Sequence, residues 1–588
     1  MNLTPEERET GKANFQSATT SDIGDKDLPW HGSITRREFL ERSALAATGA
    51  GVGLGAFYFG YQKLTGDPVR VGVIGTGDEG GVLMGAITPE YIDVVAIADI
   101  RPYNVHRAFH GDQSSEAIYA IRTGLMKKYG YKSEDQAREH VKVYTDYQDL
   151  LKDDKVEAVI IALPLFLHDK VAIEAMEHGK HVLTEKLMAH SVHQCKEMGR
   201  VANQKKLLLA TGHQRHYSIL YDNAVDTIKR GLIGDIHHIR AQWHRGNLPN
   251  KDSWAPPLPD AKMAKDLENV VNELNKLSTG PSSEAKTWSD LLKVTADLQG
   301  TADSRIDALQ KRKSLLELQL ADQKVDAAKY GYEGKTLTGG GKEYVCSPLE
   351  ELIRWRLWDR TGGGLMAELG SHQLDASGIF CTAASKDGKK VKPLTVSAVG
   401  GRHIFPMDRD CDDHVYCTYE YPGPKYKDDP NNKIVVFYSS INGNGFGGYG
   451  ETVMGTKGTL ILDREQEALL FKDAATTTKV SVTKGKDGPV LDTTASGGPA
   501  AAAKKAADSG PPSRGYTEEM EHFAWCIRNF DYENNQPKCQ PKVAMADAII
   551  ALTSNIAIKE GRRIEFKPEW FDIDSDETPE GIKPSVPV

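Results

Sequence analysis

A lysine and a histidine far apart in the chain have residue types suited to oxygen and proton chemistry. Lys186 ends the segment HVLTEK, and His372 lies in GGGLMAELGSHQLD. An ammonium group can hydrogen-bond a reacting oxygen, and it can act as a base once burial or charge lowers its pKa from about 10.4. An imidazole can take up a proton near neutral pH. Each residue also has a plain alternative, a solvated lysine after a strand and a structural histidine.

Two carboxylates accompany this histidine at helical spacing. In a helix, Glu368, His372 and Asp375 would follow each other at i, i+4 and i+7 on one face. The carboxylates could then orient the imidazole or bind substrate, and the preceding glycines would let substrate approach the backbone closely. The same spacing could ligate a metal, but only one imidazole is present, so we expect no metal here.

A glycine-rich turn follows the short apolar segment VGVI. Gly75, Gly77 and Gly80 form G-x-G-x-x-G, with Thr76 between the first two. In a strand–turn–helix unit these glycines permit the tight turn, the approach of a pyrophosphate and close helix packing. The spacing alone is weak evidence, but a second apolar segment, VVAIAD, follows at the expected distance. The pair predicts a dinucleotide-binding turn.

The second apolar segment ends in Asp99, which bears on the choice of dinucleotide. A carboxylate there would bond the adenosine ribose hydroxyls and repel a 2′-phosphate, which favours NAD. Arg101 could instead meet a 2′-phosphate, so NADP stays open. The alternative for Asp99 is a surface residue at a strand end.

Apolar segments alternate with helical ones up to residue 212, which predicts a doubly wound parallel sheet over residues 68–212. Ligands bind at the carboxyl ends of such strands. The candidate ligand-facing residues at these ends are His168, Glu185, Lys186, His213, Gln214, Arg215 and Tyr217.

The remaining chain, 213–588, predicts an α+β domain with a mainly antiparallel sheet, since residues 395–470 are rich in alternating β-forming segments. Residues 258–345 predict an inserted pair of helices packed on their own apolar seam. We expect deletion of 264–340 to spare cofactor binding, because the site motifs lie outside it. Residues 474–514 have the composition of a flexible loop.

Several stretches together resemble the Gfo/Idh/MocA family of oxidoreductases, which includes glucose–fructose oxidoreductase and inositol dehydrogenase. They include VGVIGTG, VVAIADIRP, VYTDYQDLL, TEKL, GLIGDI and GGGLMAELGSHQLD. The resemblance implies hydride transfer between NAD(P) and a hydroxyl-bearing carbon of a sugar or cyclitol, with Lys186 beside the nicotinamide. Two departures stand out: Leu187 replaces the proline of the family's Glu-Lys-Pro motif, and Glu368 replaces its aspartate.

Two rival functions stay open at this point. One is an NAD-dependent glycoside hydrolase of the same family type, and the other is a non-catalytic sugar-binding protein. We also expect a homo-oligomer formed through the C-terminal sheet. Nucleic-acid binding is not expected, because the net charge is −9 and no run of five Lys or Arg occurs. Seven cysteines are too few for a disulfide scaffold.

The N-terminal residues 1–67 read as an export signal or membrane anchor. TRREFL, at 35–40, resembles the twin-arginine consensus, and the apolar run 43–60 would be its hydrophobic region. We therefore expect the twin-arginine translocase as a partner, and a periplasmic protein or one anchored to face the periplasm. A buried helix is the alternative.

Overall fold

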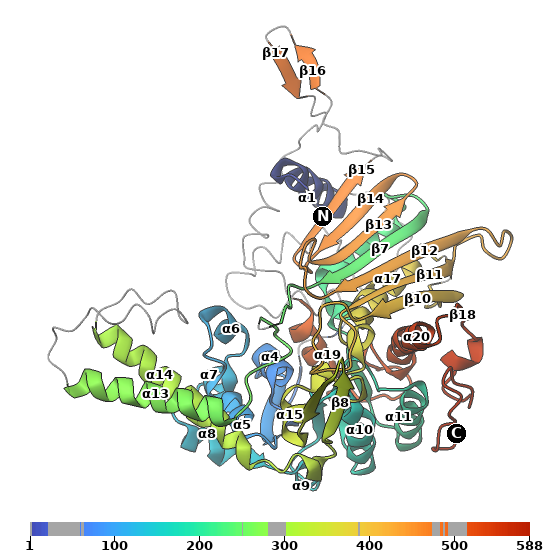
Figure 1. Ribbon diagram of the computed structural model, residues 1–588. Coiled ribbons are helices and arrows are strands. Elements are labelled where there is room, and N and C mark those ends of the chain that lie inside the picture. The colour runs from blue at the N-terminus through green and yellow to red at the C-terminus, as the bar shows by residue number, and fades with distance from the viewer. Residues whose placement is uncertain are drawn as a thin grey trace.

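The computed structural model contains two large sheets, the helices that cover them, and two small two-stranded sheets (Figure 1). TRREFL and nearly all of the apolar run lie outside the described residues, as does most of 474–514. The structure describes residues 3–20, 59, 61, 64–249, 251–279, 302–385, 388–472, 482–485, 488–491 and 514–588.

The first sheet is six-stranded and parallel, in the order β3-β2-β1-β4-β5-β6. Apart from the partly exposed edge strand β3, its strands are mostly buried, which explains their apolar sequences. The order is that of a Rossmann fold, so the predicted doubly wound sheet is confirmed. The strands are β1 (Val69–Ile74), β2 (Ile92–Ala98), β3 (Lys142–Tyr144), β4 (Ala158–Ile161), β5 (His181–Glu185) and β6 (Leu209–Gly212). The helices between them are α4 (Asp78–Ala86), α5 (Pro102–His110), α6 (Glu116–Ile121), α7 (Gly124–Tyr129), α8 (Glu134–His140), α9 (Tyr147–Leu151), α10 (His168–Glu177) and α11 (Val192–Lys205).

The second sheet is eight-stranded, in the order β15-β14-β13-β7-β12-β11-β10-β18. Only β7 and β12 pair in parallel among these neighbours, which confirms the predicted mainly antiparallel domain. The strands are β7 (Ile236–His244), β10 (Thr395–Gly401), β11 (His414–Pro422), β12 (Lys433–Ile441), β13 (Tyr449–Gly455), β14 (Gly458–Asp463), β15 (Glu467–Lys472) and β18 (Ile564–Glu565). Its helices include α12 (Ile219–Lys229), α15 (Pro348–Ile353), α16 (Asp359–Gly362), α17 (Ser371–Ala384) and α20 (Pro541–Glu560).

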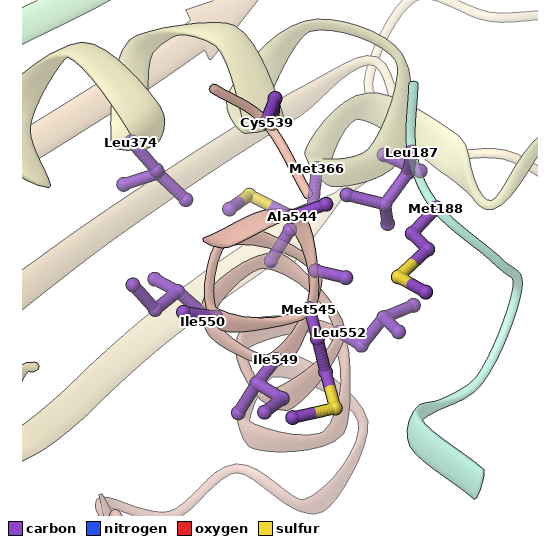
Figure 2. Packing of buried hydrophobic residues seen from close by; sticks show 14 of the residues in the cluster. Leu187, Met188, Met366, Leu374, Cys539, Ala544, Met545, Ile549, Ile550 and Leu552 are labelled. Carbon is purple, nitrogen blue, oxygen red and sulfur yellow. The ribbon is translucent and has the colours of Figure 1, made fainter. Parts of the chain in front are cut away.

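The helix α20 joins the two domains. Figure 2 shows Leu187 and Met188, which follow β5, packed around α20 together with Met366 and Leu374. By length and composition α20 could cross a bilayer, but its apolar residues are mostly buried in this core. The contact holds the residue after β5 and the segment before α17 in fixed relative positions. A further helix, α19 (Tyr516–Arg528), returns to pack in the core of the parallel sheet.

The segments on both sides of the TRREFL region are bound to the folded body. Helix α1 (Pro5–Thr20) lies along β15 (Figure 1), and its Arg8 pairs with Asp463 at the end of β14 at 2.7 Å. Tyr61 is buried in the core of the parallel sheet and donates its hydroxyl hydrogen to Glu521 at 2.7 Å. These contacts tie the N-terminal residues to both domains.

The insertion forms a helical hairpin, α13 (Ala261–Thr279) and α14 (Ala302–Ala321), followed by the strand pair β8 (Lys335–Gly339) and β9 (Lys342–Cys346). Met263, Val270 and Leu316 meet in the apolar seam between the two helices. The C-terminal part of α14 also packs on α5 of the Rossmann domain (Figure 1). The insertion is therefore fastened to the edge of the first domain.

Candidate active site

A cavity of about 870 Å³ runs from the glycine turn to Lys186, between the two domains. Its volume lies in the upper part of the range of about 300–1,000 Å³ found for ligand sites. Residues of the Rossmann domain, the insertion and the C-terminal domain all line it. They include Gly75, Gly77, Asp99, Arg101, Glu185 and Lys186, then Gln319, Tyr330 and Tyr332, then Trp355, Arg356 and Glu368.

The glycine turn forms an open cradle at one end of this cavity. Gly75 has φ of +87°, and a Cβ there would lie 2.4 Å from the carbonyl oxygen of Ala162. A Cβ on Gly80 would lie 2.1 Å from the carbonyl oxygen of Gly75. At Gly77 a Cβ would meet only the Asn104 amide, at 3.7 Å, and would project into the cavity. Backbone atoms thus pack tightly against Gly75 and Gly80, whereas Gly77 faces open space. This arrangement fits a pyrophosphate bound at the start of α4.

Asp99 is held rigidly just after β2. Its Oδ2 accepts hydrogen bonds from the Thr76 backbone N–H at 2.8 Å and from the Thr76 hydroxyl at 3.1 Å. Its Oδ1 accepts from the backbone N–H of Arg101 at 2.8 Å. The carboxylate therefore stands at the cavity edge, as a ribose-binding residue requires.

Lys186, Glu368 and Arg356 form an ion cluster in the same cavity. The Lys186 Nζ donates to the Glu368 carbonyl oxygen at 3.0 Å and to its Oε2 at 3.2 Å. The Arg356 Nε donates to Glu368 Oε1 at 2.5 Å. Burial opposes ionisation of Glu368, but Lys186, Arg356 and Arg245 outweigh it and lower its pKa to about 2. Glu368 is therefore a permanent carboxylate that links the lysine of one domain to the other.

Glu185, next to this cluster, has the opposite behaviour. Its carboxyl group is buried, and Gly212 leaves the room that it occupies. Burial, reinforced by the nearby Glu79, raises the pKa of Glu185 to about 8. The group is then mostly protonated at neutral pH.

We expect Glu185→Gln to flatten the dependence of stability on pH. The Glu185 pKa is about 4.3 unfolded and about 8 folded, so between these values the folded state binds more protons. The free energy of unfolding therefore falls as pH rises through this window. Urea unfolding midpoints of cofactor-free protein at a series of pH values measure the effect. Equal slopes for the wild type and the Gln variant would contradict it.

His372 lies deeper than Lys186 and is not among the cavity-lining residues. Its ring packs 5.4 Å from that of Trp243, and its Nδ1 has no hydrogen-bond partner among the described residues. Burial, reinforced by Lys186 and Arg215, lowers the pKa of His372 well below its usual value. The imidazole is therefore neutral at pH 7.

Glu368 and Asp375 bind other residues than His372. This corrects the prediction that the three side chains act together on one helix face. A π-helical turn, Met366–Gly370, precedes α17, so Glu368 is not in regular α-helical register with His372. Glu368 faces the two cations, and Asp375 Oδ1 lies 2.8 Å from His216 Nε2. Asp375 is fully buried and does not line the cavity.

Three of the predicted substrate contacts are corrected by the structure. Both ring nitrogens of His168 lie 2.8 Å from backbone carbonyl oxygens, those of Leu187 and Leu163. Arg215 donates from Nε to Glu465 at 2.8 Å within a buried ion network. Tyr217 lies in the core, where its hydroxyl is 2.9 Å from His522 Nδ1. These residues follow parallel strands, but their side chains turn into the protein rather than the cavity.

The insertion contributes to the site, which corrects the expectation that it lies apart from it. Gln319 of α14 and the segment around Tyr330 and Tyr332 line the cavity. Asp322 binds Arg101. The sequence carried no signal for this, because an apolar seam predicts a helix pair but not where that pair docks. Arg356 was also missed, since no spacing rule links it to Lys186.

We now expect NAD affinity to depend on the base of the insertion but not on the tip of its helical hairpin. Replacing residues 271–311 by a short linker should leave NAD affinity within about threefold, because the inner seam residues and the lining residues remain. Deleting 264–340 should weaken NAD binding strongly. Titration of both variants, with helix content checked by circular dichroism, measures this. Unchanged binding in a folded 264–340 deletion would contradict the assignment.

The fold and the cradle together define a two-domain, dinucleotide-dependent protein. Residues 69–213 match the model of an oxidoreductase family with an NAD-binding Rossmann fold, the Gfo/Idh/MocA family. These residues therefore form an NAD-binding domain of the oxidoreductase type.

Named relatives show the same likeness over part of their length. An uncharacterized oxidoreductase of Schizosaccharomyces pombe is 32% identical over 146 residues, which is 24% of this chain and 40% of the relative. A glycosyl hydrolase family 109 protein of Solibacter usitatus is 25% identical over 210 residues, 35% of this chain and 44% of the relative. The chain thus matches less than half the length of these relatives.

Among solved structures, a myo-inositol 2-dehydrogenase from Lactobacillus plantarum aligns with a TM-score of 0.46 and 12% identity, over 85% of this chain and 100% of that one. An aldose-aldose oxidoreductase from Caulobacter crescentus aligns with a TM-score of 0.47 and 13% identity, over 85% and 100%. These values are too low to transfer an activity.

Proposed function

We propose that the protein is an NAD-dependent oxidoreductase that transfers hydride between nicotinamide and a hydroxyl-bearing carbon of a sugar or cyclitol. One observation carries the proposal. The same cavity is lined by the pyrophosphate cradle and by Lys186, and the C-terminal domain holds Lys186 there through Glu368.

The bound cofactor and the residues around Lys186 have separate roles in this reaction. Bound NAD supplies the hydride acceptor or donor. An ammonium group has three donors, and Lys186 directs two contacts to Glu368, which leaves a donor for the reacting oxygen. The fixed charge of Arg356 stabilises Glu368, so Lys186 keeps one orientation. Because His372 does not line the cavity, its neutral imidazole would accept the alcohol proton through Lys186, whose charge acts on the ring.

A second candidate is glycoside hydrolysis through transient oxidation by NAD. It is favoured by the relative named a glycosyl hydrolase family 109 protein. The two functions differ in their products. Net nicotinamide reduction with a free sugar or cyclitol supports the oxidoreductase, whereas release of aglycone from a glycoside without net reduction supports the hydrolase.

The experiment is incubation of purified protein with NAD and a panel of sugars, cyclitols and glycosides. Nicotinamide absorbance and mass spectrometry of the products are recorded together. If protein that binds NAD neither reduces the nicotinamide nor cleaves any of these compounds, the proposed activity is overturned and the sugar-binding alternative remains.

Self-association through the C-terminal sheet is also proposed. The exposed Val399 on β10 supports it, and sedimentation of the purified chain tests it.

We further propose export by the twin-arginine translocase to the periplasm, supported by TRREFL and the apolar run after it. Because α1 and Tyr61 are bound to the folded body, we propose that the exported chain keeps these residues. Replacing Arg36 and Arg37 together by Lys should leave the protein in the cytoplasm, as cell fractionation would show. Normal export of that double variant would refute the proposal, and the intact mass of exported protein tests retention.

A further inference from the structure

Arg101 is held by a carboxylate from the insertion. Its Nε donates to Asp322 Oδ2 at 2.8 Å. The other oxygen, Oδ1, accepts from the backbone N–H of Tyr103 at 3.1 Å. The Asp322 side chain is 1% exposed and that of Arg101 18% exposed. The pair is therefore largely shielded from solvent, and both carboxylate oxygens are used.

The position of Asp322 is fixed from two sides. It accepts from the first turn of α5, Pro102–His110, where the helix dipole favours a negative charge. The residues after it, Val325, Ala327 and Tyr332, pack with Ile100 and Phe166 beside the strand ends. This packing fastens the segment that carries Asp322 to the adenosine end of the cavity.

This contact bears on the choice between NAD and NADP. Arg101 follows Asp99 by two residues and lines the same cavity. An arginine at this position can accommodate a 2′-phosphate. A bidentate contact to phosphate uses two guanidinium N–H groups, and here the Nε–H is already given to Asp322. The two Nη groups of Arg101 still carry N–H donors, but Asp322 compensates the charge of the guanidinium, so a 2′-phosphate would meet a paired arginine and two carboxylates.

We propose that Asp322 is a specificity-determining residue, which disfavours NADP by compensating the charge of Arg101 and adding a second negative charge beside Asp99. The inference rests on the proposed NAD-dependent function. Asp322 is a positioning residue here, since it acts on the cofactor through Arg101. A residue of the insertion thereby contributes to cofactor selectivity. The Rossmann domain alone does not contain all the residues that determine this selectivity.

Titration of the full chain, freed of bound nucleotide, with NAD⁺ and with NADP⁺ tests the proposal. Asp322→Asn keeps an oxygen for the Tyr103 N–H but loses the charge that holds Arg101. We expect about a tenfold or greater gain in NADP⁺ affinity, with NAD⁺ affinity changed by less than about threefold. Adding Arg101→Ala should cancel the gain. Glu317→Gln is the matched control, because it removes one charge from α14 where Glu317 pairs with Lys313.

The outcomes separate this inference from the proposed function. An unchanged ratio of NADP⁺ to NAD⁺ affinity in folded Asp322→Asn overturns it, as does an equal gain in Glu317→Gln or a gain that survives Arg101→Ala. Arg101→Ala alone provides a check that leaves Asp322 in place. It should barely alter the weak NADP⁺ binding, and a large loss would show that Arg101 is already free to bind phosphate. A wild type that binds neither nucleotide refutes the NAD-dependent function itself, and this inference with it.

Discussion

Lys186→Ala is expected to slow nicotinamide reduction by about 10²–10⁴-fold, the usual loss when a group that handles the reacting proton or oxygen is removed. NAD should stay bound, because Lys186 is not part of the glycine turn that would hold the pyrophosphate. Single-turnover reduction of bound NAD, followed by nicotinamide absorbance, measures the rate. A near-wild-type rate would contradict the assignment.

Companion variants separate the role of Lys186 from its structural contact. Glu368→Gln keeps the size of the side chain but removes the charge that pairs with Lys186, so a smaller loss is expected. His372→Ala should also slow the reaction, and the double variant should lose less than the product of the single losses, as residues acting as a unit do. Asp375→Asn should have a smaller effect, since Asp375 bonds His216 and does not line the cavity.

Gly77→Val is expected to lower NAD affinity by about 100-fold or more without unfolding the protein. The new side chain would stand in the cavity, where the nearest atom to its Cβ is the Asn104 amide at 3.7 Å. Isothermal titration with NAD⁺ gives the affinity, and the unfolding midpoint gives the stability.

Gly80→Ala is the matched contrast. Its Cβ would lie 2.1 Å from the backbone oxygen of Gly75, so the turn itself must move. We expect this variant to lose both stability and binding, whereas Gly77→Val loses binding alone. Wild-type NAD⁺ affinity in Gly77→Val would show that the pyrophosphate does not lie at this turn.

The two sheets could be predicted because their signals are local. Buried parallel strands read as continuous apolar runs, and the partly exposed strands of the second sheet alternate. Gly75, Gly77 and Asp99 could be placed for the same reason, since the cradle is made by residues adjacent in sequence.

The rest of the site depends on packing between distant segments. Whether a side chain after a strand turns toward the ligand depends on its neighbours, and His168 turns toward two backbone carbonyl groups instead. The ion pair between Lys186 and Glu368 joins two segments that are far apart in the sequence, so no local pattern indicates it. Asp322 could not be assigned, because nothing in α14 indicates that its end docks beside Arg101.

Transfer of a labelled hydride tests the central claim most directly. A sugar or cyclitol that reduces the nicotinamide is prepared with deuterium on its hydroxyl-bearing carbons, and the nucleotide is recovered from the protein and examined by mass spectrometry. Our account predicts deuterium in the nicotinamide ring of the wild type, and about 10²–10⁴-fold slower labelling in Lys186→Ala. Product formation with no deuterium in the nicotinamide would contradict hydride transfer at this site.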